Sequence, residues 1–176
     1  MLLRSQSAWL DRRLRAVLRR LPPLDGRPIR VLGAPGLSDG RGPVYAGSFV
    51  PARRIALACG PAELGRIVVH ELFHFVWVRL GNRRRWGWQD LLRREFRRGA
   101  RGELGWSAEW RKWDLRRTDP AGRTRRWREY CCESFCDTAA WLYCGRRHAE
   151  FTLSAEARVG RRQWWDAEMS GRGLPV

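Results

Sequence analysis

The apolar positions of the chain repeat with a helical period in some segments and alternate, as in strands, in others. Helices are predicted where apolar residues recur three or four positions apart: 5–21, 61–80, 88–98, 107–117, 129–144 and a segment from Ser154. Strands are predicted where apolar residues alternate: 27–32, 44–50 and 53–59. The predicted fold class is therefore α+β, mostly helical, with a small twisted sheet of about three strands packed on two long helices.

Local signals set several boundaries of these helices. Ser7 is placed to cap the first helix, because a serine side chain accepts a hydrogen bond from a free N–H of the first turn. Gly81 and Gly145 follow the 61–80 and 129–144 helices, where glycine ends helices by adopting a left-handed conformation. Trp164-Trp165 is expected to pack the C-terminal part onto the body, and the last residues are expected to be loose.

The length of 176 residues suits one domain, 1–176, with four parts. An N-terminal helix (1–26) precedes the sheet and the 61–80 helix (27–81). The third part, 82–128, holds six tryptophans and 16 basic against six acidic residues, and we interpret it as an insertion over or beside the site. The fourth part, 129–176, holds the last strongly predicted helix and the C-terminal tail.

The net charge of +17 is typical of a protein that meets nucleic acid or another acidic partner. All but one of the 35 basic residues are arginine, however, so part of this charge reflects a GC-rich coding sequence. No segment is long and apolar enough to span a membrane, and the N-terminus lacks the pattern of a signal peptide. The odd number of cysteines, five, predicts reduced thiols in a cytoplasmic protein.

Because arginine occurs almost everywhere else, the longest arginine-free stretches, 67–78 and 129–145, mark the buried parts. The first contains His70-Glu71-x-x-His74. Residues four apart lie on one face of a helix, so both imidazoles can reach one metal ion, with Glu71 turned toward its open side. The alternative is a pair of core histidines. It is the weaker interpretation, because a buried His-Glu-His group is costly unless it is paired or binds a metal.

The second arginine-free stretch carries Glu129, Glu133 and Asp137 at helical spacing. Acidic groups stacked in this way repel one another, so a cation must face them. We assign Glu133 as the third metal ligand and Asp137 as the acceptor of the outer N–H of a liganding histidine. Glu129 is expected to pair with arginines of the 82–128 segment. Three other residues compete for the ligand position: Glu103, Glu109 and His148.

His70-Glu71-x-x-His74 followed by Glu133-x-x-x-Asp137 resembles the gluzincin metallopeptidases, and the small size is similar to that of the minigluzincins. The resemblance covers about 28–81 and 129–145 and implies a Zn²⁺ cofactor held by two histidines and a glutamate. It departs from the family at Cys132, where an asparagine often precedes the glutamate ligand. The 82–128 segment matches no part of that family.

The resemblance implies hydrolysis of a peptide or protein substrate, with Glu71 as the general base for a metal-activated water. Family analogy places a further donor after the glutamate helix, and the candidates are His148, Tyr143 and Tyr130. If the 53–59 strand edges the sheet, it could bind an extended peptide through its backbone.

Other interpretations stay open. Cys132 and Cys136 lie four apart and could bind a metal, but small buried hydrophobic residues are the better reading. The chain could instead be a nucleic-acid-binding or regulatory module with a structural zinc and an Arg/Trp-rich surface over 82–128. A degenerate peptidase fold that serves as a scaffold is a third possibility. The sequence does not predict the oligomeric state.

Overall fold

The computed structural model describes residues 2–39, 42–145, 148–171 and 173–176. The fold is mixed, mostly helical, with a small sheet, which confirms the predicted α+β class. The elements follow the chain in the order β1 (Leu3–Arg4), α1 (Ala8–Leu18), β2 (Leu24–Asp25), β3 (Ile29–Gly33), β4 (Ala46–Phe49), β5 (Arg54–Leu57), α2 (Leu64–Arg79), α3 (Asn82–Arg97), α4 (Trp106–Trp113), α5 (Asp119–Gly122), α6 (Arg125–Cys144), α7 (Ala155–Met169) and β6 (Leu174–Pro175).

The main sheet has the strand order β1-β3-β5-β4, in which β3 runs parallel to both β1 and β5, and β4 runs antiparallel to β5. The predicted 53–59 strand is β5 and lies inside the sheet, so the condition for it to bind an extended peptide as an edge strand is not met. β5 pairs with β3 on one side and with β4 on the other, so β4 is the edge strand next to β5 and β1 is the opposite edge.

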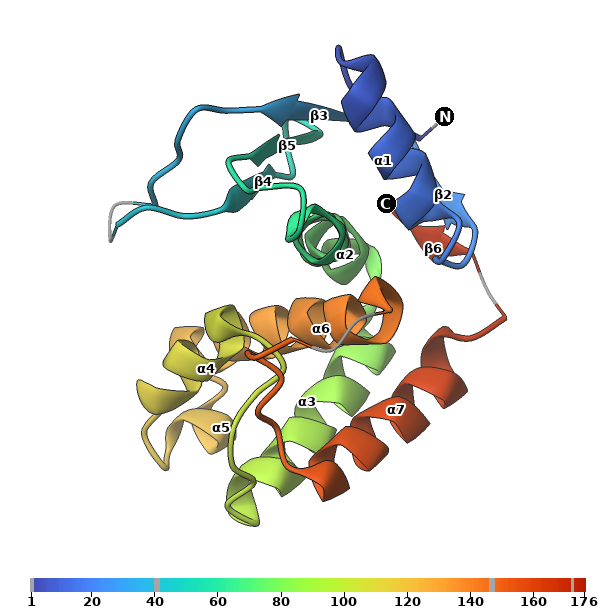
Figure 1. Cartoon of the computed structure of the whole chain (residues 1–176). Helices are drawn as coiled ribbons and strands as arrows, with labels where there is room; N and C mark the ends of the chain where they lie inside the picture. Colours follow the sequence, from blue (N-terminus) through green and yellow to red (C-terminus); the bar gives the residue numbers. More distant parts are fainter. Residues whose placement is uncertain (1, 40–41, 146–147, 172) are drawn as a thin grey trace.

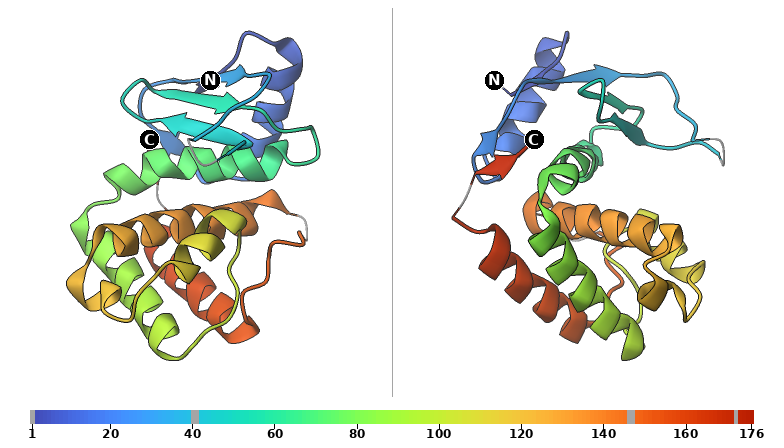
Figure 2. Two further views of the ribbon diagram at one scale, coloured as in Figure 1. Left: turned by 90° about the vertical axis from the view of Figure 1, so that its left-hand side faces the viewer. Right: turned by 180° about the vertical axis from the view of Figure 1, so that it is seen from behind.

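Helix α2 is the centre of the molecule. In the views of Figures 1 and 2 it lies between the sheet and α6. It has no side-chain cap at its start, and most of its residues are buried, including Val68, Leu72, Phe73 and Val76 at 0% exposure. A helix that is apolar on nearly all sides is stabilised by burial between two layers, and α2 has that position.

Helix α6 packs along α2, and α3 and α7 lie on the side of α6 that faces away from α2 (Figure 1). Helix α4 also packs against α6. Thr124 caps α6 by accepting a hydrogen bond from Trp127 N, so α6 begins four residues before the predicted start. Trp88 of α3 and Trp127 of α6 are completely buried. The 82–128 segment therefore supplies part of the core and is not only a cover beside it.

The C-terminal residues are fixed, contrary to the expectation that they are loose. β6 pairs in parallel with β2, and Val176 N donates a hydrogen bond of 2.8 Å to Asp25 O. Trp165 is buried at 2% exposure, as the sequence predicts. All five cysteines are free thiols. Across the part of the chain that the structure describes, no helix has the length and apolar character needed to cross a membrane.

Candidate metal centre

His70 and His74 of α2 point toward Glu133 of α6. The two Nε2 atoms lie 3.3 Å apart, and Glu133 Oε2 lies 3.2 Å from that of His70 and 3.9 Å from that of His74. A tetrahedral Zn²⁺ with nitrogen and oxygen ligands at about 2.0–2.1 Å has edges of about 3.3–3.4 Å between its ligand atoms. The three atoms thus already have nearly the spacing of three corners of a zinc site, and the residues fit the ion that the sequence predicts.

The electrostatics of this cluster favour a cation. Burial alone would lower the pKa of His70, but the charge of Asp137 and hydrogen bonds to Asp137 and Glu133 outweigh it and hold that pKa well above its usual value. Burial would also lower the pKa of His74, but the charges of Cys132 and Glu133 outweigh this effect and raise that pKa to about 9. Burial would raise the pKa of Glu133, yet the charge of His74 and the contacts with His70 lower it to about 2. A bound metal ion would supply the positive charge that the protons of His70 and His74 supply in its absence.

Asp137 contacts the outer nitrogen of the His70 ring. Its Oδ1 accepts a hydrogen bond from His70 Nδ1 at 2.7 Å, and its Oδ2 accepts one from Ala108 N of α4 at 3.0 Å. The carboxylate is buried and lies against Gly105, where a Cβ atom would collide with it. In the neutral ring this arrangement favours the tautomer with its proton on Nδ1, which leaves the lone pair of Nε2 free for a metal.

His74 has a different partner on its outer nitrogen. Cys132 Sγ lies 3.4 Å from His74 Nδ1. A hydrogen bond from Cys136 and the charge of His74 lower the pKa of the Cys132 thiol to about 6, against the effect of burial. Sequence reasoning placed Cys132 and Cys136 in the core and missed this contact, which depends on how α6 faces α2.

Glu71 lies in the same cleft as the three ligands, one position after His70. Ser48 of β4 donates a hydrogen bond to the Glu71 carboxylate and lies 2.9 Å from the Glu71 carbonyl oxygen. The outer strand therefore holds the carboxylate that the sequence assigns as general base. Nothing in the local sequence around Ser48 indicates this role, because it depends on β4 crossing beside α2.

Arg111 of α4 completes the surroundings of Glu133. Its Nη2 lies 3.2 Å from Glu133 Oε1, while its Nη1 donates a hydrogen bond to Ser107 O at 2.8 Å. Arg111 therefore occupies the oxygen that faces away from the histidines and leaves Oε2 directed at them. The sequence gives no signal for this residue among so many arginines.

The candidate metal centre lies in an open cleft of about 1180 Å³. Its walls come from residues 35–39 and 42–50, which include β4, from α2 and from the start of α4, with Trp106 and Trp110 on the α4 side. Small-molecule sites usually measure about 300–1,000 Å³. The cleft is therefore large enough for a polymer segment as well as for a small ligand.

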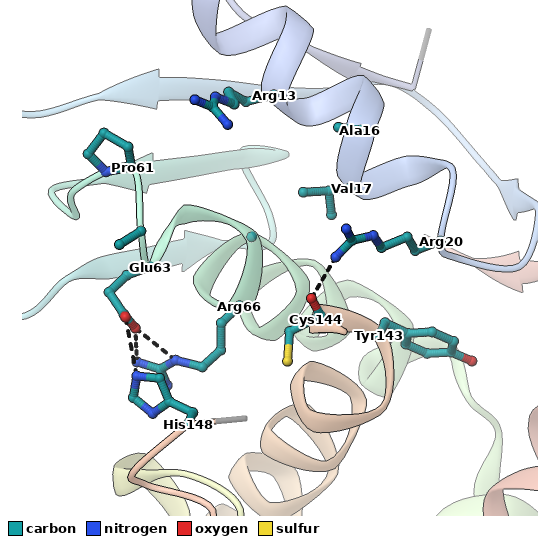
Figure 3. A pocket seen from close by; sticks show the side chains of 12 residues that line it. Arg13, Ala16, Val17, Arg20, Pro61, Glu63, Arg66, Tyr143, Cys144 and His148 are labelled. Carbon is teal, nitrogen blue, oxygen red and sulfur yellow. Dashed lines mark hydrogen bonds and ion pairs between the residues drawn. The ribbon is translucent and has the colours of Figure 1, made fainter. Parts of the chain in front are cut away.

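His148 and Tyr143, the predicted donors, lie elsewhere. Both line a second pocket of about 280 Å³ between α1, the start of α2 and the end of α6 (Figure 3). His148 Nε2 lies 3.2 Å from Glu63 Oε1, and the hydroxyl of Tyr143 accepts a hydrogen bond from Trp165 Nε1 at 3.0 Å. The structure does not bring either residue to the cleft wall beside the three ligands, so neither is placed to act there.

The remaining alternatives have partners outside the cluster. Glu103 accepts a hydrogen bond from the hydroxyl of Tyr130 and is completely buried. Glu129 is partly exposed and pairs with Arg125 at 2.6 Å, which agrees with the expected pairing with arginines of the 82–128 segment. Glu109 is partly exposed and does not line the cleft. Among the competing carboxylates, only Glu133 approaches both histidines.

Comparisons with protein-family models, with curated proteins and with solved structures find no match to this chain. The function must therefore be argued from the site itself.

Proposed function

We propose that the protein is a zinc-dependent peptide hydrolase of the gluzincin type, with His70, His74 and Glu133 as ligands. The observation that carries this proposal is the near-tetrahedral spacing of three ligand atoms from residues that line an open cleft, together with Glu71. A structural zinc site is closed by four protein ligands, whereas a catalytic site leaves one position free. An open cleft beside three ligands favours the catalytic type.

Zn²⁺ in this site would lower the pKa of a bound water toward 7 and polarise the carbonyl of the scissile bond. Glu71 accepts the proton of the attacking water and delivers it to the leaving amine. The hydrogen bond from Ser48 fixes one carboxylate oxygen of Glu71 and leaves the other for this transfer. Asp137 keeps His70 in the tautomer that binds metal.

The substrate class follows from the outer strand. Among the described residues, β4 pairs only with β5, and Ala46, Gly47 and Ser48 line the cleft. The free edge of a strand offers backbone N–H and C=O groups to an extended peptide, which adds as a further strand. A peptide bound along β4 would pass Ser48 and Glu71 and therefore cross the candidate metal centre.

The test uses Glu71→Gln, which keeps the size of the side chain and removes the base. The purified protein is stripped with a chelator, reloaded with Zn²⁺ and assayed on a mixture of unstructured peptides by mass spectrometry. Hydrolysis should appear on reloading and fall about 10²–10⁴-fold in Glu71→Gln. Glu156→Gln, on an exposed side chain of α7, is the matched control and should match the unmodified protein. Equal activity of Glu71→Gln and Glu156→Gln would refute the assignment of the base.

A further inference from the structure

Two thiols of α6 lie behind the candidate metal centre. Cys132 and Cys136 are one helical turn apart, and both face His74 of α2. Cys136 is completely buried and Cys132 is half-buried. The sequence favours a core role for both, but a purely apolar role would not require two sulfurs and an imidazole nitrogen to converge. Ligand atoms of these three residues all lie within 4.8 Å of one another.

The spacing of these atoms suits a metal ion. Bonds of about 2.3 Å to sulfur and about 2.0 Å to nitrogen give tetrahedral edges of about 3.8 Å between two sulfurs and about 3.5 Å between sulfur and nitrogen. The observed distance from Cys132 Sγ to His74 Nδ1 is 3.4 Å. No separation among the ligand atoms exceeds 4.8 Å, which is at most about 1.3 Å longer than an ideal edge, so an ion could enter with side-chain shifts of about 1 Å.

We propose that Cys132, Cys136 and Nδ1 of His74 form a second metal site, selective for a thiophilic cation such as Zn²⁺ or Cd²⁺. It differs from the first site in donor type, because two thiolates and one imidazole select soft cations more strongly than two imidazoles and a carboxylate do. It also uses the other nitrogen of the ring, since Nε2 of His74 faces Glu133. This inference goes beyond the proposed hydrolysis and does not depend on it.

The shared ring links the two sites. His74 binds an ion through Nδ1 only after that nitrogen has lost its proton, and two cations on one imidazole repel each other. Occupation of the thiol site should therefore weaken binding at the first site. A thiophilic cation in excess would then promote release of the ion from the first site. In this way the cysteine pair would regulate the first site.

The test is a Co²⁺ titration of the reduced, metal-free protein, because thiolate ligation to Co²⁺ produces a sulfur-to-metal charge-transfer band that nitrogen and oxygen ligands do not. We expect this band in the unmodified protein and in His70→Ala, which lacks a ligand of the first site only. Cys136→Ala should abolish the band. Cys131→Ala removes a neighbouring buried thiol outside the cluster and should retain it. Cys136→Ser gives the same comparison if the alanine variant fails to fold by circular dichroism.

Absence of the band in the unmodified protein, or its survival in folded Cys136→Ala or Cys136→Ser, would overturn the inference. Loss of the band in folded His70→Ala would also overturn the inference, because metal binding by the thiols would then require an intact first site. Hydrolysis assayed on the same samples keeps the two proposals distinguishable. Activity that depends on Glu71 without a charge-transfer band rejects the second site alone. Absence of hydrolysis in folded, Zn²⁺-loaded Cys136→Ser, where the thiol site cannot weaken the first site, rejects the hydrolase alone.

Discussion

Gly105 is the position at which the smallest change should disturb the candidate metal centre. It precedes α4 with an extended backbone, φ 177°, so its conformation does not require glycine. Its lack of a side chain matters instead, because a Cβ atom there would lie closer than 3.0 Å to the carboxylate of Asp137. That carboxylate is buried and held by His70 Nδ1 and Ala108 N, so it cannot move aside without breaking a hydrogen bond.

We expect Gly105→Ala to act through metal affinity. A side chain that orients a metal-binding histidine typically contributes 10–100-fold to affinity, or about 1.4–2.7 kcal/mol. The collision itself should destabilise the metal-free fold by about 1–3 kcal/mol, the usual cost of overpacking. Gly60→Ala is the matched control, since a Cβ atom at Gly60 has nothing within 4 Å. It should change stability by less than about 0.5 kcal/mol and leave affinity unchanged.

Co²⁺ affinity is measured through the visible ligand-field bands, and the stability of the metal-free proteins through urea unfolding. The two readouts separate a loss of fold from a loss of ligand orientation. If Gly105→Ala folds and binds Co²⁺ as tightly as Gly60→Ala does, then the orientation of His70 by Asp137 makes no contribution to metal binding, and the reasoning fails.

Two further predictions concern the buried ion pairs that anchor the loop before Gly105. Arg161 is completely buried and lies 2.8 Å from carboxylates of both Glu95 and Glu103. Arg161→Met should lower the free energy of unfolding in urea by about 3–5 kcal/mol, because it leaves buried charges unpaired. A loss below about 1 kcal/mol would contradict this. Burial opposes the charges of Arg161 and Lys112 at Glu103, and its pKa lies below the usual 4.5. The resulting stability is present above pH 4.5 and is lost as the pH falls through the lowered value. Stability should therefore fall less steeply with acid in Glu103→Gln, and identical acid dependence of the two proteins would refute this.

Features that depend on local chemistry could be predicted from the sequence. Ser7 caps α1 by accepting a hydrogen bond from Leu10 N, and Gly81 and Gly145 follow α2 and α6 with positive φ values of 77° and 68°. Each of these signals acts within one helical turn, so it does not depend on the rest of the fold.

Strand order and the short strands could not be predicted, because pairing joins residues that are far apart in the chain. β2 and β6 pair across almost the whole sequence, and β1 joins β3 through Leu3 and Ile29. The start of α6 was missed for another reason. The arginine-free stretch begins at residue 129, but the first turns of α6 carry arginines on their exposed side while Trp127 is buried.

The same contrast holds for the candidate metal centre. Burial and spacing on single helices led to the prediction of His70, His74, Glu133 and Asp137, because buried acids stacked on one helix need positive charge to face them. Rarity was a poor guide to His148, since an uncommon residue type says nothing about position. The contacts of Ser48, Arg111 and Gly105 with the centre arise only when separate elements pack together.

The tryptophans of the Arg/Trp-rich 82–128 segment occupy two kinds of position, buried and exposed. Trp88 and Trp127 are core residues, which accounts for part of the tryptophan content without a ligand. Trp106 and Trp113 expose 55% and 67% of their surface and form an edge-to-face pair at 5.4 Å beside the cleft. Binding of nucleic acid or another acidic partner through this segment stays a prediction.

The position of the ligands determines what an ion would do for the fold. His70 and His74 lie on α2, which packs against the sheet, whereas Glu133 lies on α6, which packs against the remaining helices. An ion bound by both would add about 2.7 kcal/mol of stability at a concentration 100-fold above its dissociation constant. Two bonds extend this link to α4, because Ala108 N contacts Asp137 and Arg111 pairs with Glu133. Since α4 forms a wall of the cleft, the contacts that orient the proposed ligands also hold this wall in place beside them.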